Sequence, residues 1–199
     1  MGKRSNFKRV ERDFYPTPYA AVMPLVPYLP NGALDKFMGD VNLNPGSVNY
    51  AQSFKYAEPC AGDGALMRHL RIHGGFCTYA SDIKPESHGI KTANALDIEI
   101  KDLNGADYII TNPPRSRDNK SDYILHRMID HFRNLAPTWL LFDADWMHTK
   151  QSAPFMPYCH KIVSVGRMKW IPDSKMTGKD NCAWYLFDNF KDRTEFIGR

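Results

Sequence analysis

The residues with the clearest chemical use are an asparagine and two prolines in the middle of the chain. Asn112 and Pro113-Pro114 directly follow residues 108–111, a run rich in β-branched and aromatic side chains that predicts a buried strand. The strand must end at the prolines, because neither has an N–H to give to a sheet and each restricts the residue before it. We therefore expect an asparagine amide and a rigid turn at the carboxyl edge of a sheet, where ligands bind in open α/β folds.

This turn suits a substrate that carries an amine. The Asn112 amide oxygen and the Pro113 carbonyl could together accept both hydrogens of an –NH₂ group. Such a pair would bend the amine toward a tetrahedral nitrogen and free its lone pair for attack. Since Asn-Pro is also a common turn opener, a strand that simply ends in a turn is the alternative explanation.

A second pattern, earlier in the chain, is typical of a nucleoside-binding loop. A predicted strand over residues 54–57 leads into residues 58–64, Glu-Pro-Cys-Ala-Gly-Asp-Gly, and then into a helix predicted over residues 65–72. The glycines let the backbone approach a ligand, and the helix start offers free N–H groups. The next predicted strand, residues 76–81, ends at Asp82, whose carboxylate is placed to accept hydrogen bonds from ribose hydroxyls. Asp97 follows a weaker third strand.

The glycine loop departs from a dehydrogenase fingerprint, because Met67 occupies the position of the third glycine. A lone Gly-x-Gly also fits a plain tight turn between strand and helix. Glu58, four residues before Gly62, would repel a pyrophosphate, yet it suits a ligand with an amine or a sulfonium. S-adenosylmethionine has both.

The composition narrows the fold class and the kind of protein to be expected. The chain has 199 residues, 43% of them hydrophobic, which predicts one domain over residues 1–199 with a sizeable core. Helix and strand signals alternate, which favours an α/β fold. The four cysteines form no C-x-x-C pair, so no zinc site, other metal or disulfide framework is expected. The N-terminus lacks the apolar core of a signal peptide and no apolar run reaches membrane-spanning length, which predicts a soluble cytoplasmic protein without membrane contact.

The net charge of +4 is modest, but the basic residues cluster in three predicted loops. One cluster lies in residues 1–12, a basic segment that could be flexible. The second cluster follows the two prolines and consists of Arg115, Arg117 and Lys120. The third follows the strand predicted over residues 161–165 and consists of Arg167, Lys169, Lys175 and Lys179. Such clusters are what binding to a phosphate backbone needs. Ordinary solvated charge is the alternative, and for residues 1–12 alone it is the better one.

The helix and strands predicted after residue 123 agree with an α/β fold. Apolar residues at helical spacing predict a core-facing helix from Ile124 to Leu135. Residues 138–143 predict another buried strand, and residues 161–165 and 182–187 predict two more strands close together in sequence. This order predicts a mostly parallel sheet with a hairpin at its end.

Together these motifs resemble the S-adenosylmethionine-dependent amino-methyltransferases, in particular the small DNA adenine-N6 methyltransferases of phages and prophages. The matching stretches, in chain order, are Tyr15-Pro16-Thr17-Pro18, Glu58 to Gly64, Ser81-Asp82, Asn94 to Asp97 and Thr111 to Pro114. The resemblance implies a Rossmann-like class I methyltransferase fold: a mostly parallel seven-stranded sheet with helices on both faces and a C-terminal β-hairpin. It also implies S-adenosylmethionine as cofactor, surrounded by Tyr15, Thr17, Pro18, Glu58, Pro59, Gly62, Gly64, Asp82, Ile83 and Asp97.

The resemblance further implies methyl transfer to an exocyclic amino group of a base, best matched by adenine N6 in DNA, with the base extruded from the duplex. Asn112, Pro113, Pro114 and Arg115 would form the catalytic turn. The family usually has an aromatic residue where this chain has Arg115, whose guanidinium can stack on a base and contact phosphate. Trp146, Trp170 or Tyr123 could supply the aromatic face instead. The full set of expected substrate contacts is Arg115, Arg117, Lys120, Trp146, Lys169, Trp170, Lys175 and Lys179.

Other functions stay open at this point. Asn-Pro-Pro followed by an aromatic residue also serves methyltransferases of protein glutamine amides, and related enzymes act on RNA. Because of Arg115, a catalytically inactive module that binds cofactor and nucleic acid is a further hypothesis. Larger family members carry a separate target-recognition region, for which only residues 167–181 could serve here. The sequence does not settle the target sequence or the oligomeric state.

Overall fold

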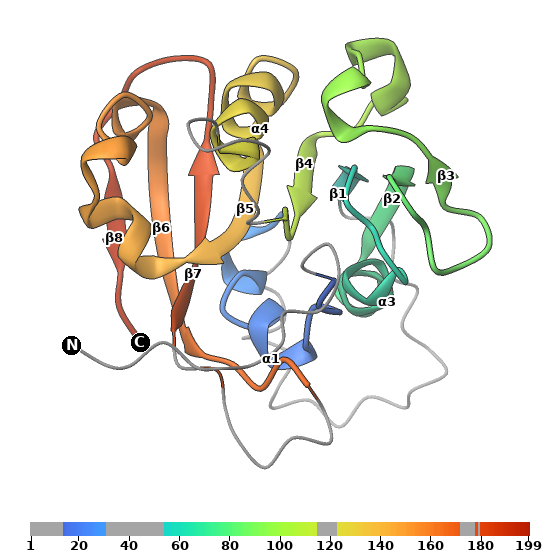
Figure 1. The fold of residues 1–199 in the computed structure, drawn as a ribbon, viewed down its shortest axis with the longest axis horizontal. Helices are drawn as coiled ribbons and strands as arrows, with labels where there is room; N and C mark the ends of the chain where they lie inside the picture. Colours follow the sequence, from blue (N-terminus) through green and yellow to red (C-terminus); the bar gives the residue numbers. More distant parts are fainter. Residues whose placement is uncertain (1–13, 31–53, 115–122, 172–177, 179) are drawn as a thin grey trace.

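The computed structural model describes residues 14–30, 54–114, 123–171, 178 and 180–199. Within these ranges eight strands form one sheet in the order β3-β2-β1-β4-β5-β7-β6-β8 (Figure 1). The strands are β1 (Phe54–Glu58), β2 (Gly75–Asp82), β3 (Lys91–Thr92), β4 (Tyr108–Thr111), β5 (Thr138–Asp143), β6 (Cys159–Arg167), β7 (Asn181–Phe187) and β8 (Glu195–Ile197).

The sheet is mostly parallel. β1 pairs in parallel with β2 and β4, β2 with β3, and β4 with β5. β7 runs antiparallel to both β5 and β6, so β6 and β7 form the predicted hairpin. The short β8 pairs in parallel with the outer side of β6 and makes an eighth strand where seven were expected.

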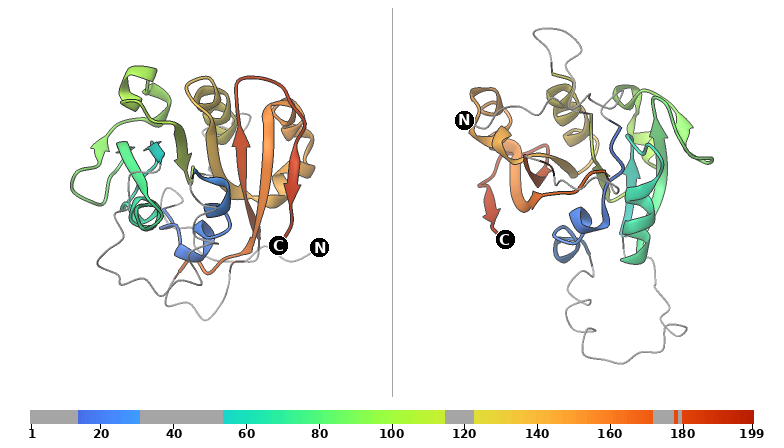
Figure 2. Two further views of the ribbon diagram at one scale, coloured as in Figure 1. Left: turned by 180° about the vertical axis from the view of Figure 1, so that it is seen from behind. Right: turned by 60° about the horizontal axis from the view of Figure 1, so that its bottom comes forward.

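Helices cover both faces of the sheet (Figure 2). The α-helices are α1 (Tyr19–Val22), α3 (Ala65–Ile72) and α4 (Ile124–Arg133). Short 3₁₀ helices span η2 (Val26–Tyr28), η3 (Ala95–Asp97), η4 (Ile100–Leu103), η5 (Ala144–His148), η6 (Lys150–Ser152) and η7 (Met156–Tyr158). No helix among the described residues is both long and apolar enough to cross a membrane.

Each face has its own hydrophobic core, because successive side chains of a strand point to opposite sides. Ile109 packs in the cluster that contains the buried face of α4. Ile110, its neighbour, packs in the cluster that contains α1 and α3. Trp184 lies in this second cluster, fully buried, and its Nε1 donates to the Ala21 carbonyl at 2.7 Å, so its polar atom is satisfied inside the core.

The strand order creates a switch point at the centre of the sheet. From β1 the chain moves outward to β2 and β3, and then returns to the other side of β1 as β4. The connections that leave β1 and β4 at their carboxyl ends therefore diverge. A crevice at such a switch point is where open α/β sheets bind ligands. Glu58 ends β1 and Thr111 ends β4, so the glycine loop and the Asn-Pro-Pro turn both open onto this crevice.

Candidate active site

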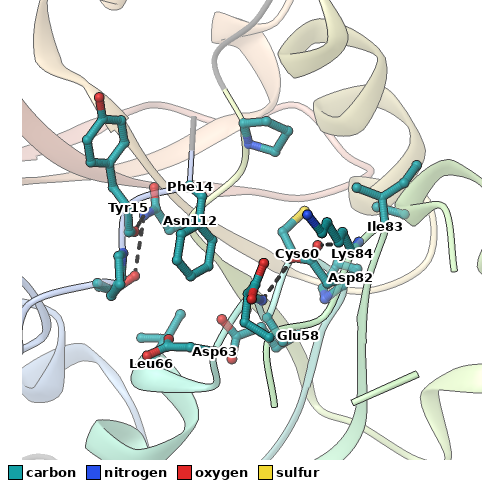
Figure 3. Close-up of a pocket in the computed structure, with 18 of the residues that line it drawn as sticks. Phe14, Tyr15, Glu58, Cys60, Asp63, Leu66, Asp82, Ile83, Lys84 and Asn112 are labelled. Atoms are coloured by element: carbon teal, nitrogen blue, oxygen red, sulfur yellow. Dashed lines mark hydrogen bonds between the residues drawn. The ribbon is translucent and has the colours of Figure 1, made fainter. Parts of the chain in front are cut away.

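A cavity of about 370 Å³ lies at the carboxyl ends of β1, β2 and β4 (Figure 3). It is bounded by the glycine loop, by the loop after β2, by the start of α4 and by the N-terminal strap, our name for residues 14–17. Its lining residues are Phe14, Tyr15, Pro16, Thr17, Glu58, Pro59, Cys60, Ala61, Gly62, Asp63, Ala65, Leu66, Asp82, Ile83, Lys84, Glu86, Asn94, Ala95, Asn112, Pro114, Ile124 and Met128.

The glycine loop is shaped by backbone conformations that favour glycine. Gly62 and Gly64 have φ of +54° and +77°, in the left-handed region. A Cβ on Gly62 would lie 2.8 Å from Cε2 of Phe14, so the ring of the strap residue packs directly on the loop backbone. Gly64 precedes α3 and does not line the cavity; its N–H donates to the Ala61 carbonyl at 2.7 Å.

Glu58 is a buried carboxylate at the floor of the cavity. Its side chain is 2% exposed, and Oε2 has no hydrogen-bond partner among the described residues. Desolvation raises the pKa of Glu58 well above its ordinary value, and the nearby Asp63 and Asp82 charges raise it further. Because a buried charge is costly unless it is paired, this site favours a cationic ligand group that would keep the carboxylate ionised. A sulfonium or an ammonium fits that requirement.

Asp82 ties the glycine loop to β2. Its Oδ2 accepts from the Gly62 N–H at 2.8 Å and its Oδ1 from the Lys84 N–H at 2.9 Å. Each carboxylate oxygen has a second lone pair, so Asp82 can also accept from a pair of ligand hydroxyls. The next residue, Ile83, is 65% exposed and presents an apolar side chain to the cavity. A polar group beside an apolar face is what a ribose and its attached ring need.

The Asn112 amide is held in one orientation by the strap. Its Nδ2 donates to the Tyr15 carbonyl and to Thr17 Oγ1, each at 3.3 Å. Both amide hydrogens are thereby used, and the amide oxygen is left as an acceptor at the cavity. Pro114 lines the cavity as well, whereas Pro113 is buried and does not.

Not every expected cofactor residue reaches the cavity. Pro18 precedes α1 and lies outside the lining. Asp97 is exposed and also outside it, because Asn94 caps the 3₁₀ helix η3 and turns Asp97 outward. Asn94 and Ala95 line the cavity in its place. Within this motif the cavity is thus lined by the first two residues and not by Asp97.

Trp146 does not provide an aromatic face for a base, contrary to expectation. It is 8% exposed, and its ring packs against Phe142 and Tyr185 at centroid distances of 5.2 and 5.5 Å. Its Nε1 donates to His126 Nε2 at 3.0 Å, so its polar atom is satisfied inside the core. The side chain is a core residue of the α4 face.

The structure brings Trp170 to the strap. Its ring meets that of Tyr15 edge-on, with centroids 6.5 Å apart and an interplanar angle of 62°. Lys169 beside it is exposed, whereas Tyr123 directly precedes α4 and packs against His126. Arg115, Arg117, Lys120, Lys175 and Lys179 lie outside the described residues.

Several lining residues carried no clear signal in the sequence. Phe14 directly precedes the Tyr-Pro-Thr-Pro motif, but its packing on Gly62 joins segments that are far apart in sequence. Asp63 accepts a hydrogen bond from the N–H of Ala65, the first residue of α3, at 2.9 Å and pairs with Arg68 at 2.9 Å. Desolvation raises the pKa of the Cys60 thiol, so this thiol is protonated at neutral pH and is not activated as a nucleophile.

No protein-family model matches the sequence, and no curated protein matches it significantly. Solved structures do match the fold. The type IIL restriction-modification enzyme MmeI, determined in complex with DNA, gives a TM-score of 0.56 at 12% identity over 92% of this chain and 39% of that chain. A Listeria monocytogenes protein described as a class I S-adenosylmethionine-dependent methyltransferase gives 0.53 at 10% identity, over 98% of this chain and 68% of that chain.

A third match is a Vibrio vulnificus YJ016 protein described as a modification subunit of a type I restriction enzyme. It gives a TM-score of 0.50 at 12% identity and covers 92% of this chain. The chain spans about half the length of that subunit, 46% of it. At such identities the likeness establishes the fold, which is the Rossmann-like class I methyltransferase fold. The fold class predicted from the sequence is confirmed.

Proposed function

We propose that this protein transfers a methyl group from S-adenosylmethionine to an exocyclic amino group of a nucleic-acid base, adenine N6 in DNA being the best-supported substrate. The observation that carries the proposal is the fixed Asn112 amide. Its nitrogen is tied to the strap, so its oxygen remains to accept an amine hydrogen at the mouth of a cavity that also holds the unpaired Glu58 carboxylate.

The cavity suits the cofactor on three counts. Bound S-adenosylmethionine supplies a methyl group on a positively charged sulfur. Glu58 offers a buried carboxyl group, whose Oε2 has no partner among the described residues and whose ionised form a cationic ligand would stabilise. Asp82 offers carboxylate lone pairs for ribose hydroxyls, and Ile83 offers an apolar surface beside them.

The chain's own residues prepare the amine for attack. The Asn112 oxygen accepts one amine hydrogen. We assign the other to the backbone carbonyl of Pro113, although that residue is buried and does not line the cavity. The two acceptors would turn the nitrogen lone pair out of conjugation with the ring. No strong base is needed beforehand, because the lone pair already exists and the proton leaves after attack. Positioning and local electrostatics then carry most of the rate effect. The protonated Cys60 thiol gives no support to an alternative in which a thiolate attacks a ring carbon.

Exposed cations favour a nucleic acid over a protein substrate, and one fold match supports the choice of DNA over RNA. Arg167 and Lys169 are exposed at the end of β6 and just beyond it, on the segment that carries Trp170 to the strap. Cations in that position suit a phosphate backbone. Among the fold matches, MmeI was determined in complex with DNA.

The test is transfer of labelled methyl from S-adenosylmethionine to unmethylated duplex DNA, with RNA and a glutamine-containing peptide as parallel substrates. The products are digested to nucleosides or amino acids and identified by mass. N6-methyldeoxyadenosine is the expected product. Label in RNA or in glutamine would redirect the proposal to that substrate, and cofactor binding without any transfer would overturn the assignment as an enzyme.

A further inference from the structure

The backbone carbonyl and the side-chain ring of Tyr15 have different surroundings. Its carbonyl accepts from Asn112 Nδ2 at 3.3 Å. Tyr15 is one of the residues that line the cavity, and it is partly exposed. In Figure 3 this ring lies beside the Asn112 amide and points away from the carboxylates of Glu58, Asp63 and Asp82. The side chain is therefore on the opposite side of Asn112 from the groups that suit the cofactor.

Trp170 supports the Tyr15 ring from the connection between β6 and β7. The two rings meet edge-on at 6.5 Å between centroids, a favourable arrangement for aromatic pairs. Gly178 packs against Trp170: its N–H donates to the Met168 carbonyl at 2.8 Å, and a Cβ there would lie 3.2 Å from Trp170 Cδ1. The aromatic pair thus joins the strap to the segment that carries the exposed Lys169.

We propose that Tyr15, braced by Trp170, is the aromatic surface on which the target base stacks; the inference rests on the proposed function and reassigns the Tyr15 side chain from cofactor to substrate. A base that leaves the duplex loses its stacking partners, and aromatic side chains commonly replace them. The Asn112 oxygen holds the amino group in the plane of the base. An aromatic ring beside that oxygen covers one face of the same base.

This arrangement makes one residue serve two tasks. The Tyr15 carbonyl sets the orientation of the amide that receives the amine, and the Tyr15 ring covers the base that carries the amine. Replacing the side chain leaves the carbonyl in place. Substitutions at Tyr15 can therefore separate base stacking from the orientation of Asn112.

The test compares Tyr15→Phe, Tyr15→Leu and Tyr15→Ala in the full chain, with duplex DNA as methyl acceptor. Tyr15→Phe keeps the ring, so kcat/KM should stay within about twofold of wild type. Tyr15→Leu keeps apolar volume without an aromatic face, and with Tyr15→Ala it should lose about tenfold or more, the range found when a stacking aromatic is removed. Trp170→Leu should show a smaller loss. The cofactor Kd, from calorimetry, should stay within about twofold for all four variants.

Tyr158→Ala is the matched control, because this tyrosine is also partly exposed but lies in η7, outside the cavity. It should leave kcat/KM for DNA unchanged. Wild-type kinetics in Tyr15→Leu would overturn the stacking role while the proposed function stands. A parallel loss of cofactor affinity in Tyr15→Leu would return the ring to the cofactor. A wild-type protein that methylates no nucleic acid would overturn both proposals.

Discussion

Asn112 Nδ2 donates to Thr17 Oγ1 at 3.3 Å, although the two residues are 95 positions apart. Thr17 is 5% exposed, so this contact is shielded from bulk water. The strap and the Asn-Pro-Pro turn, which are separate motifs in the sequence, therefore act as one unit. The orientation of the Asn112 amide depends on a residue that the sequence suggested only as a cofactor contact.

Thr17→Val should lower the methyl-transfer rate about 2- to 10-fold, the range expected for one hydrogen bond. The substitution keeps the shape but removes the acceptor, so the Asn112 amide is less firmly oriented. Single-turnover rates with saturating cofactor measure this effect directly. Thr17→Ser retains the hydroxyl and should behave like wild type. Equal rates for the valine and serine variants would show that the contact does not orient the amide.

Glu58→Gln should make the cofactor-free protein more stable at neutral pH. The raised pKa means that the folded state binds more protons than the unfolded state, so the free energy of unfolding of the wild type falls as pH rises above about 4.5. The free energy of unfolding continues to fall until the pH passes the pKa of Glu58 in the folded protein. The glutamine variant lacks this titration, so its advantage should grow with pH. Denaturant unfolding of the wild type and of Glu58→Gln, repeated from acidic to neutral pH, measures this difference in the free energy of unfolding. A difference that does not change with pH would contradict the prediction.

The same substitution should weaken cofactor binding about tenfold or more, because a cationic ligand loses its buried counter-charge. A bound cation favours the ionised carboxylate, so wild-type affinity should rise with pH until Glu58 is ionised in the free protein. Calorimetric Kd values from acidic to neutral pH test this. The pH dependence should be much smaller in Glu58→Gln, and an equal slope in both proteins would assign it to another group.

Gly62→Ala should destabilise the protein by more than the strain of its backbone alone, about 1–2 kcal/mol for a side chain in the left-handed region. The added Cβ would also meet the Phe14 ring at 2.8 Å. Gly89→Ala is the matched control, since its φ is +84° and no atom of the described residues lies within 4 Å of the new Cβ. Denaturant midpoints should therefore shift further for Gly62→Ala. Combining it with Phe14→Ala should recover part of the difference, and no recovery would rule out the ring contact as the cause.

The parts of the fold that the sequence predicted best are the central strands. The predicted bounds of β4 and β5 agree with the structure, because each is a short run of mostly apolar residues, rich in β-branched or aromatic side chains, with a proline nearby. The helix predicted to reach Leu135 ends at Arg133. β8 was not predicted, since three residues at a sheet edge, with Phe196 59% exposed, carry no periodic signal.

The lining of the cavity was predictable where one motif sets the position of a side chain, as at Glu58, Asp82 and Asn112. It was not predictable where tertiary packing decides. Trp146 lies in a core cluster built from elements that are separate in the sequence, so its aromatic character alone did not reveal its burial. The contact of Phe14 with Gly62 likewise depends on how the strap crosses the glycine loop.

The most direct test of the central claim is methyl transfer to unmethylated duplex DNA by the wild type and Asn112→Ala, measured side by side with the cofactor Kd of each. The account predicts N6-methyldeoxyadenosine from the wild type. It predicts a loss of about 100-fold or more in kcat for Asn112→Ala, comparable to losing one preorganised hydrogen bond at a reacting centre, with the Kd little changed. Equal losses of turnover and cofactor affinity, or full activity without the Asn112 amide, would contradict it.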